Sequence, residues 1–292
     1  MDGAGESTAW TASPTTAKRW LGRRMRAHRE AAALTVREVA ALLRATSDKV
    51  SYTEAGTHAF KPRDLEGVLF PAYEVPEEDR PGLLEACRRS RLRGWWQGYD
   101  ADIVPDWALR YIGLEQGATT LRLWGSLHPP GLLQAPAYTE ALMFTRLPRP
   151  HEDDVAARVD VRQRRQTVLH RDPEPLAAHF VLDEAVLRRV VGGPEVMAAQ
   201  AARVLAAADL PSVTVQVVPF SRGPHPDTAG SFSILGFGPG DPGVVYLEGR
   251  SAEYVEDAVR IEDYASVFDA QAALALGPEE SAEFIARVAA TS

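Results

Sequence analysis

One stretch decides the fold of the first part of the chain: Leu34 to Gly56, which reads LTVREVAALLRATSDKVSYTEAG. Thr35, followed by Glu38 three residues later, has the spacing of a capping box, so a helix is predicted to begin there. Apolar residues then recur at helical spacing, at Val39, Leu42 and Leu43. These three side chains are expected to face inward.

A second short helix pattern follows almost at once. Thr46 is a second candidate N-cap, and Val50 and Thr53 continue an inward face. Gly56 then supplies a C-terminal stop. Ala40 lies where the two helices would cross, and a larger side chain there would push them apart. Two helices of about eight residues joined by a turn of about three to four residues have the geometry of a helix-turn-helix.

The second helix is expected to point polar side chains outward: Ser47, Asp48, Lys49, Ser51 and Tyr52. Hydroxyls, a carboxylate and an ammonium group on a rigid helix can reach base edges in the DNA major groove. The alternative is a plain antiparallel helix pair with a solvated face. The caps, the turn and the stop all agree with one another, which favours DNA binding.

This stretch resembles the Cro/Xre-type helix-turn-helix family, and the resemblance extends back through Leu21 to Glu30 as that family's first helix. The resemblance implies that Ser47 to Tyr52 read bases and that Thr35 to Arg37 lie near the phosphate backbone. Two positions depart from the family. Val36 stands where Gln is usual, so one phosphate contact is expected to be missing, and Arg44 stands in the turn where Gly is usual.

The expected DNA-binding set combines cations with hydroxyl-bearing and cap residues: Arg19, Arg23, Thr35, Arg37, Thr46, Ser47, Asp48, Lys49, Ser51, Tyr52 and Lys61. Base choice is expected to depend on Lys49, Ser51 and Tyr52. Salt-dependent affinity is expected to depend on the cations Arg19, Arg23, Arg37 and Lys61.

The charge of the chain is distributed unevenly. Its net charge is −8, which by itself argues against a nucleic-acid partner. Residues 18–64, however, contain 11 Lys and Arg against 5 Asp and Glu, a local net charge of +6. Residues 1–17 carry −2, and the remainder carries −12. A basic module on an acidic body suits a DNA-binding regulator, because phosphates are attracted to one end only.

Composition also argues against several other classes of protein. Cys87 is the only cysteine, which excludes an intrachain disulfide and a Cys-rich zinc site and suits a reducing compartment. Gly192 to Pro194 lacks the flanking residues of a phosphate loop, and no metal, cofactor or catalytic residue is expected. Apolar runs are too short for a membrane span, and the first residues lack a secretory pattern. A cytoplasmic protein without membrane contact is therefore expected.

The order of patterns predicts an α+β chain, with an all-α helix-turn-helix domain followed by a mixed α+β domain. Residues 1–16 are expected to be a disordered tail, 17–75 the DNA-binding domain, 76–94 a connecting helix and 95–290 the α+β domain. In the last of these, strands are expected at 119–124, 176–182, 213–218, 231–237 and 244–247. Long helices are expected at 155–170, 195–208, 257–276 and 278–290.

Residues spread over positions 95–290 have a recognisable order and spacing: Trp95-Trp96, Leu114-Glu115, Pro130 to Gln134 with Tyr138, Arg162 with Arg165-Gln166, Asp183-Glu184, Gly193-Pro194 with Gln200, Val218 to Phe220, Gly230 with Phe232, and Tyr246 with Glu248. In this order they resemble the antitoxin-like (ligand-binding-like) domain that follows Xre-type helix-turn-helices in many actinobacterial regulators. The resemblance implies an architecture and a small partner protein encoded nearby, but no defined reaction.

This domain carries four candidate ligand-binding residues: His225, Tyr246, Glu248 and Arg250. Tyr246, Glu248 and Arg250 lie at a strand end and in the loop after it, where ligand contacts are common; a solvated strand edge is the alternative. His225 with Asp227 has the residue types of a metal or acid–base pair, whereas a surface loop punctuated by prolines is the plainer interpretation.

The sequence therefore predicts a sequence-specific DNA-binding transcription regulator, not an enzyme, whose second domain dimerises and senses a small-molecule effector or a small partner protein. A homodimer on a palindromic operator is inferred because one short recognition helix is too small to be selective. Two alternatives stay open: an antitoxin-like interaction protein that sequesters a small partner, and an enzyme domain tethered to a helix-turn-helix.

Overall fold

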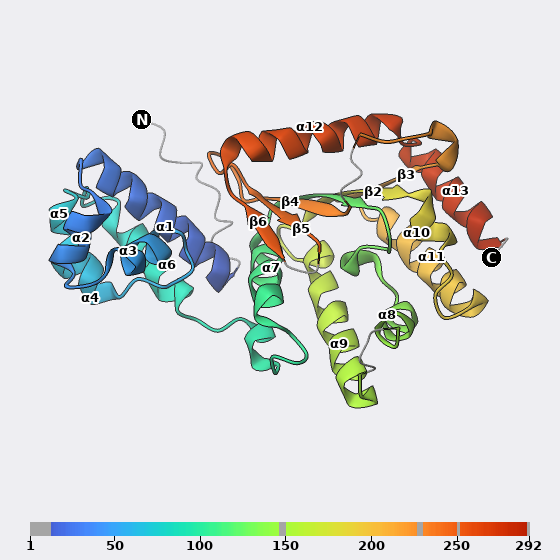
Figure 1. Ribbon diagram of the computed structural model, residues 1–292, viewed down its shortest axis with the longest axis horizontal. Helices are drawn as coiled ribbons and strands as arrows, with labels where there is room; N and C mark the ends of the chain where they lie inside the picture. Colours follow the sequence, from blue (N-terminus) through green and yellow to red (C-terminus); the bar gives the residue numbers. More distant parts are fainter. Residues whose placement is uncertain (1–12, 146–149, 227–229, 250–251, 291–292) are drawn as a thin grey trace. The chain divides into compact units, whose positions relative to one another are not determined.

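The computed structural model describes residues 13–145, 150–226, 230–249 and 252–290, and it divides into two units, Met1–Gly98 and Tyr99–Ser292 (Figure 1). The described part of the first unit is helical, and the second unit joins a six-stranded sheet to helices. The predicted α+β class is confirmed. Among the described residues, no helix combines the length and the hydropathy that a membrane span requires.

The first unit is a bundle held by one apolar core. Its elements are α1 (Pro14–Ala31), α2 (Val36–Leu42), α3 (Ser47–Glu54), α4 (Pro62–Asp64), the π-helical turn η2 (Leu65–Leu69), α5 (Phe70–Ala72), α6 (Arg80–Ser90) and the 3-10 turn η3 (Trp95–Gly98). The core takes Leu21 from α1, Val39 from α2, Val50 from α3 and Leu83 from α6. Residues 76–94, where a connecting helix is expected, thus contain a helix that packs against α1 and completes this core.

α1 begins before residue 16, where the expected tail ends. The Ser13 hydroxyl accepts a hydrogen bond from the Thr16 backbone N–H at 3.1 Å and so caps the helix. Pro14 follows in the first turn, where a missing N–H costs nothing. Residues 1–12, which include Trp10, lie outside the described part of the chain.

α2 and α3 form the predicted helix-turn-helix. The Thr35 hydroxyl accepts from the Glu38 N–H at 3.2 Å, and the Glu38 carboxylate accepts from the Thr35 N–H at 2.8 Å, which confirms the capping box. Thr46 caps α3 through the Lys49 N–H at 3.3 Å. Between the helices, Arg44 adopts a left-handed conformation with φ 49°, so the turn accommodates a side chain where Gly is usual in the resembled family.

The inward face of α2 differs from the predicted one. Leu42, expected in the core, is 49% exposed. Val39 and Ala40 are buried, and Leu43 packs against the same cluster, so the inward face of α2 runs from Val39 through Leu43 to Ala40. Leu42 follows Val39 by three positions and lies on the far flank of that face, so the prediction was wrong at this residue.

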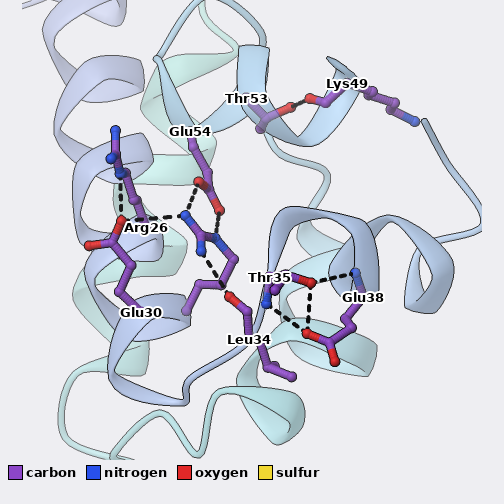
Figure 2. Close-up of polar contacts among 9 residues, drawn as sticks. Arg26, Glu30, Leu34, Thr35, Glu38, Lys49, Thr53 and Glu54 are labelled. Carbon is purple, nitrogen blue, oxygen red and sulfur yellow. Dashed lines mark hydrogen bonds and ion pairs between the residues drawn. The ribbon is translucent and has the colours of Figure 1, made fainter. Parts of the chain in front are cut away.

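A buried ion pair ties α1 to the end of α3 (Figure 2). The Arg29 guanidinium donates two hydrogen bonds to the Glu54 carboxylate, at 2.7 Å and 2.9 Å. A third bond, at 2.8 Å to the Leu34 carbonyl, holds the segment that leads into α2. The Arg29 side chain is 9% exposed and the Glu54 side chain 6% exposed. One cation therefore fixes three segments relative to one another.

Two glycines let α1 and the end of α3 approach closely. A Cβ at Gly22 would lie 2.4 Å from the Glu54 carbonyl oxygen, and a Cβ at Gly56 would lie 2.6 Å from the Arg19 Cα. Gly56 also has φ +70°, a conformation that favours glycine, and it lies just past the last turn of α3. The predicted stop is thus also a contact point between helices.

The second unit is built on a mixed sheet with strand order β3-β2-β1-β4-β5-β6. The pairs β1–β2 and β2–β3, in one half of the sheet, are parallel, and the pairs β1–β4, β4–β5 and β5–β6 are antiparallel. The strands are β1 (Thr120–Gly125), β2 (Ala177–Asp183), β3 (Val213–Val218), β4 (Phe232–Gly236), β5 (Val244–Leu247) and β6 (Glu253–Val255). The first five lie where strands are expected. β6 is additional, because three residues are too few to show an alternating pattern.

Helices cover both faces of this sheet (Figure 1). α12 (Ala258–Leu274) packs on one face, over a cluster that includes Trp124 and Phe232. On the other side lie α7 (Asp106–Gly117), α8 (Pro136–Met143), α9 (Glu152–Arg165), α10 (Glu184–Arg188), α11 (Pro194–Ala208) and α13 (Pro278–Ala290), with the 3-10 turns η4 (Gly131–Leu133) and η5 (Gln166–His170). Because it is covered on both faces, β2 reads as a nearly continuous apolar run.

Residues of the second resemblance meet in a buried hydrogen-bond network. The Gln134 side-chain oxygen accepts from Arg162 at 2.6 Å and from Thr139 at 3.0 Å. The Gln200 amide donates to the Leu133 carbonyl at 2.7 Å and accepts from the Ala135 N–H at 2.8 Å. These bonds fasten the turn before α8 to α9 and α11, so the motif has a structural role.

We expect the Arg29→Met substitution to lower the free energy of unfolding of the first unit by about 3 kcal/mol, because it leaves the buried Glu54 carboxylate without its partner. Amide hydrogen exchange in α1 and α3 measures the change. Arg26→Met is the matched control: Arg26 pairs with Glu30 at 2.8 Å on the same helix, but both side chains are more than half exposed, so its loss should cost at most about 1 kcal/mol. Equal effects of the two substitutions would contradict the assigned role of Arg29.

Arg44→Gly should stabilise the helix-turn-helix by about 1 kcal/mol, because a left-handed conformation is strained for a residue with a Cβ. Arg44→Ala keeps the Cβ and removes the same charge, so it should give no gain. The same exchange measurement on α2 and α3 compares the two. A gain shared by both variants would assign the effect to charge instead of backbone strain.

Candidate nucleic-acid interface

α3 presents a polar surface to solvent. The residues expected to face outward are all exposed: Ser47, Asp48, Lys49, Ser51 and Tyr52. Asp48 lies in the first turn, where its charge complements the helix dipole. Figure 2 shows the Lys49 side chain extending away from the Glu54 carboxylate, while the Lys49 carbonyl accepts a hydrogen bond from Thr53 at 2.6 Å. The helix thus buries Val50, Thr53 and Glu54 and offers its outer side to a partner.

An aromatic pair lies at the C-terminal end of this surface. The rings of Tyr52 and His58 lie 5.6 Å apart at an interplanar angle of 37°. The Tyr52 carbonyl accepts from the backbone N–H groups of Thr57 and His58 and from the Thr57 hydroxyl at 2.7 Å, which folds the following loop back onto α3. Tyr52 remains 54% exposed. The ring is therefore held in place and still accessible.

Exposed cations surround α3 in the chain: Arg37 on α2, Arg44 in the turn, Lys49 on α3, and Lys61 and Arg63 before and in α4. Guanidinium and ammonium groups of this kind contact DNA phosphates. Arg63 lies 3.5 Å from Asp64 and keeps 79% of its side chain exposed, so the pairing leaves it available. Of the four cations predicted to contact phosphates, Arg37 and Lys61 are thus on the surface.

Arg19 and Arg23 are placed differently from the other cations. Arg19 is only 4% exposed and lies against Gly56 in the crossing of α1 with the end of α3, and Arg23 is half-buried. A side chain as buried as Arg19 is not presented to a phosphate. Its position on α1, one turn before Gly22, gives it a packing role in the same crossing.

Thr35 and Thr46 reach the surface as cap residues. Each uses its hydroxyl to accept a backbone N–H of the helix that follows. Sequence reasoning did not single out Arg44, His58 and Arg63 for this surface, or the Arg29–Glu54 pair beneath it. Arg44, His58 and Arg63 give little sequence signal because isolated polar residues in turns are common. The Arg29–Glu54 pair gives little because 25 positions separate its members.

The candidate ligand residues of the second unit do not converge. His225 lies with its Nε2 3.8 Å from an Asp183 carboxylate oxygen, and its ring packs edge-on against Trp124 at 4.8 Å, in the cluster under α12. Tyr246 lies in the cluster on the opposite face, between Tyr111 at 4.4 Å and Tyr254 at 5.3 Å. The sheet therefore separates the two side chains.

The surroundings of Tyr246 and Glu248 also differ. Burial raises the pKa of the Tyr246 phenol well above its usual value, and the nearby Glu248 charge adds to this shift. Glu248 itself is exposed at the end of β5. Arg250 and Asp227 lie outside the described residues. Within the described ranges, no three His, Cys, Asp or Glu side chains gather as a metal site would require.

The geometry of the first unit can do one kind of chemistry well: non-covalent recognition of a polyanion by a rigid helix with hydroxyl, ammonium and aromatic groups on its exposed side. Residues 20–83 match a family model described as a helix-turn-helix domain, which supports DNA binding. No curated protein and no solved structure gives a significant match. Residues 109–287, more than half of the chain, match a second family model, described as a domain of unknown function (DUF5753). This chain therefore belongs to the DUF5753 family and carries a helix-turn-helix domain ahead of the domain that defines it.

Proposed function

We propose that the protein is a sequence-specific DNA-binding transcription regulator of the Cro/Xre type, with α3 as its recognition helix. The observation that carries the proposal is the exposed outer side of α3 above the buried Arg29–Glu54 pair. A helix whose end is held by two charge-assisted hydrogen bonds presents its side chains at a fixed angle. Such preorganisation suits base readout, where a misplaced donor loses its contact.

A homodimer is part of the proposal. α3 spans only Ser47–Glu54, about 12 Å, and therefore reads a short half-site. Two copies related by a two-fold axis would read a palindromic operator. The second unit is the larger body available for dimerisation, and it carries a net charge of −11 from 16 Arg against 27 Asp and Glu. Its charge directs DNA to the first unit.

The second unit is proposed to sense a small molecule or a small partner protein, in an antitoxin-like role, and no catalytic residue is assigned to it. The separation of His225 from Tyr246 by the sheet favours a protein partner, because the two side chains do not line one pocket. A protein acting on DNA in this way is proposed to reside in the cytoplasm.

The double substitution Lys49→Ala with Tyr52→Ala should abolish base preference while general DNA affinity persists, because the remaining cations still contact phosphates. Selection from random duplexes followed by sequencing measures this. The unmodified protein should enrich a palindromic motif, and the variant should lose about tenfold or more in discrimination. Arg26→Ala, which removes an exposed cation from α1, is the control and should keep the motif. Undiminished discrimination in the double variant would sink the assignment of α3.

Lys61→Ala and Arg37→Ala should each flatten the plot of log affinity against log salt concentration by about 0.9, equally for all DNA sequences. Each substitution removes one phosphate contact. Arg19→Ala serves as the contrasting variant, because a buried residue should affect stability and leave the slope unchanged. If the salt dependence of DNA affinity became weaker in a folded Arg19→Ala variant, Arg19 would contact a phosphate, which would contradict its assignment as a packing residue.

A further inference from the structure

Three exposed apolar side chains of the second unit follow three neighbouring strands. Leu127 follows β1 and is 56% exposed, Val190 follows β2 and α10 and is 61% exposed, and Phe220 follows β3 and is 56% exposed. β1, β2 and β3 are adjacent and parallel. Their carboxyl ends therefore meet at one edge of the sheet, and the loops that carry these side chains emerge side by side.

A hydrogen bond and the strand pairing bring the loops together. The Glu184 carboxylate accepts a hydrogen bond from the Phe220 N–H at 2.7 Å, which joins the loop after β3 to the start of α10. At the other end of α10, the charge of Arg189 acts on His128, whose pKa is lowered by burial and by this charge. His128 is the neighbour of Leu127. The hydrogen bond thus joins Phe220 to α10, and the parallel pairing of β1 with β2 places the loop of Leu127 beside them.

Arginines border this apolar surface. Arg188 and Arg189 end α10, and Arg222 follows Phe220 by two residues; all three are exposed. Arg188 pairs with Glu184, whereas Arg189 and Arg222 form no ion pair with another described residue. We call Leu127, Val190, Phe220, Arg188, Arg189 and Arg222 the carboxyl-edge patch. Its positive rim stands out in a unit with a net charge of −11.

We propose that the carboxyl-edge patch binds a segment of a partner protein that is both acidic and apolar, such as an amphipathic helix or strand with Asp or Glu beside Leu or Phe. This inference rests on the proposed partner-sensing function and names the surface that performs it. An apolar centre with a charged rim is the usual anatomy of a protein–protein interface. Guanidinium groups form paired hydrogen bonds with carboxylates, which selects acidic partners.

A nucleic acid fits this patch less well. Phosphates gain nothing from Leu127, Val190 and Phe220, whose exposure is relieved only by apolar contact. The three arginines of the patch are also few against the acidic charge of the unit. A protein segment uses both halves of the patch at once, because its apolar side chains cover the centre while its carboxylates meet the rim.

The test uses the full chain and three fluorescein-labelled synthetic peptides. The first alternates Glu with Leu and Phe, the second replaces each Glu by Lys, and the third replaces each Leu and Phe by Ser. Fluorescence anisotropy should show binding of the first peptide only, with an affinity that falls as salt is added. Phe220→Asp combined with Val190→Asp should raise its Kd about tenfold or more. Val259→Asp is the matched control, since Val259 is 72% exposed at the start of α12 and should leave the Kd unchanged.

Equal binding of the Glu and Lys peptides, or equal Kd values for the patch variant and the control, would overturn the proposal. So would dissociation of a homodimer by the patch variant, which would identify the occupant as a second copy of this chain. Competition by a DNA duplex for the peptide would likewise exclude a protein-specific surface. DNA selection with the same variants distinguishes the proposed peptide-binding patch from the proposed DNA-binding function. If the protein binds the peptide but selects no DNA sequence, the proposed regulator is contradicted and the proposed patch is not.

Discussion

The helix-turn-helix depends on the buried ion pair between Arg29 and Glu54. Removing Arg29 and Glu54 from water is costly, and the cost is offset only when geometry is good and the remaining polar atoms find partners. Two hydrogen bonds to the carboxylate and a third to the Leu34 carbonyl meet that condition. The pair lies where α1, the entry to α2 and the end of α3 meet, and Gly22 allows the backbones to come together there. The orientation of the exposed side of α3 therefore follows from an interaction on its buried side.

The second unit uses the same device between other elements. Arg165 on α9 donates two hydrogen bonds, each of 2.8 Å, to the Glu115 carboxylate on α7, which is fully buried. The guanidinium also lies 5.2 Å from the Tyr111 ring centroid. Arginine suits both sites because its planar fork matches a carboxylate and it keeps its charge when buried, which lysine does not. All 16 cationic side chains of residues 99–292 are arginines, consistent with a unit that uses guanidinium geometry as well as charge.

Local patterns predicted much of this architecture. The capping box at Thr35, the cap at Thr46 and five strands were readable because each depends on neighbouring residues. What failed or was missed depends on tertiary contacts. The exposure of Leu42 follows from which side of α2 meets the core, and the burial of Arg19 follows from a helix crossing. His225 and Tyr246 have side chains that are common in ligand-binding sites. They lie on opposite faces of the sheet, however, and local sequence patterns do not show this.

The two surfaces attract partners over different distances. Cations on the first unit act on phosphates through a net positive field, which extends over about 10 Å at 0.1 M salt. The arginines of the carboxyl-edge patch sit in a negative unit, so beyond that distance the field of the unit repels acidic molecules. They attract a carboxylate only at contact, once apolar side chains have already met Leu127, Val190 and Phe220. Long-range electrostatic attraction thus steers DNA to the first unit. Binding at the carboxyl-edge patch instead requires a partner with a matching apolar face. The negative charge of the second unit also repels DNA from this patch.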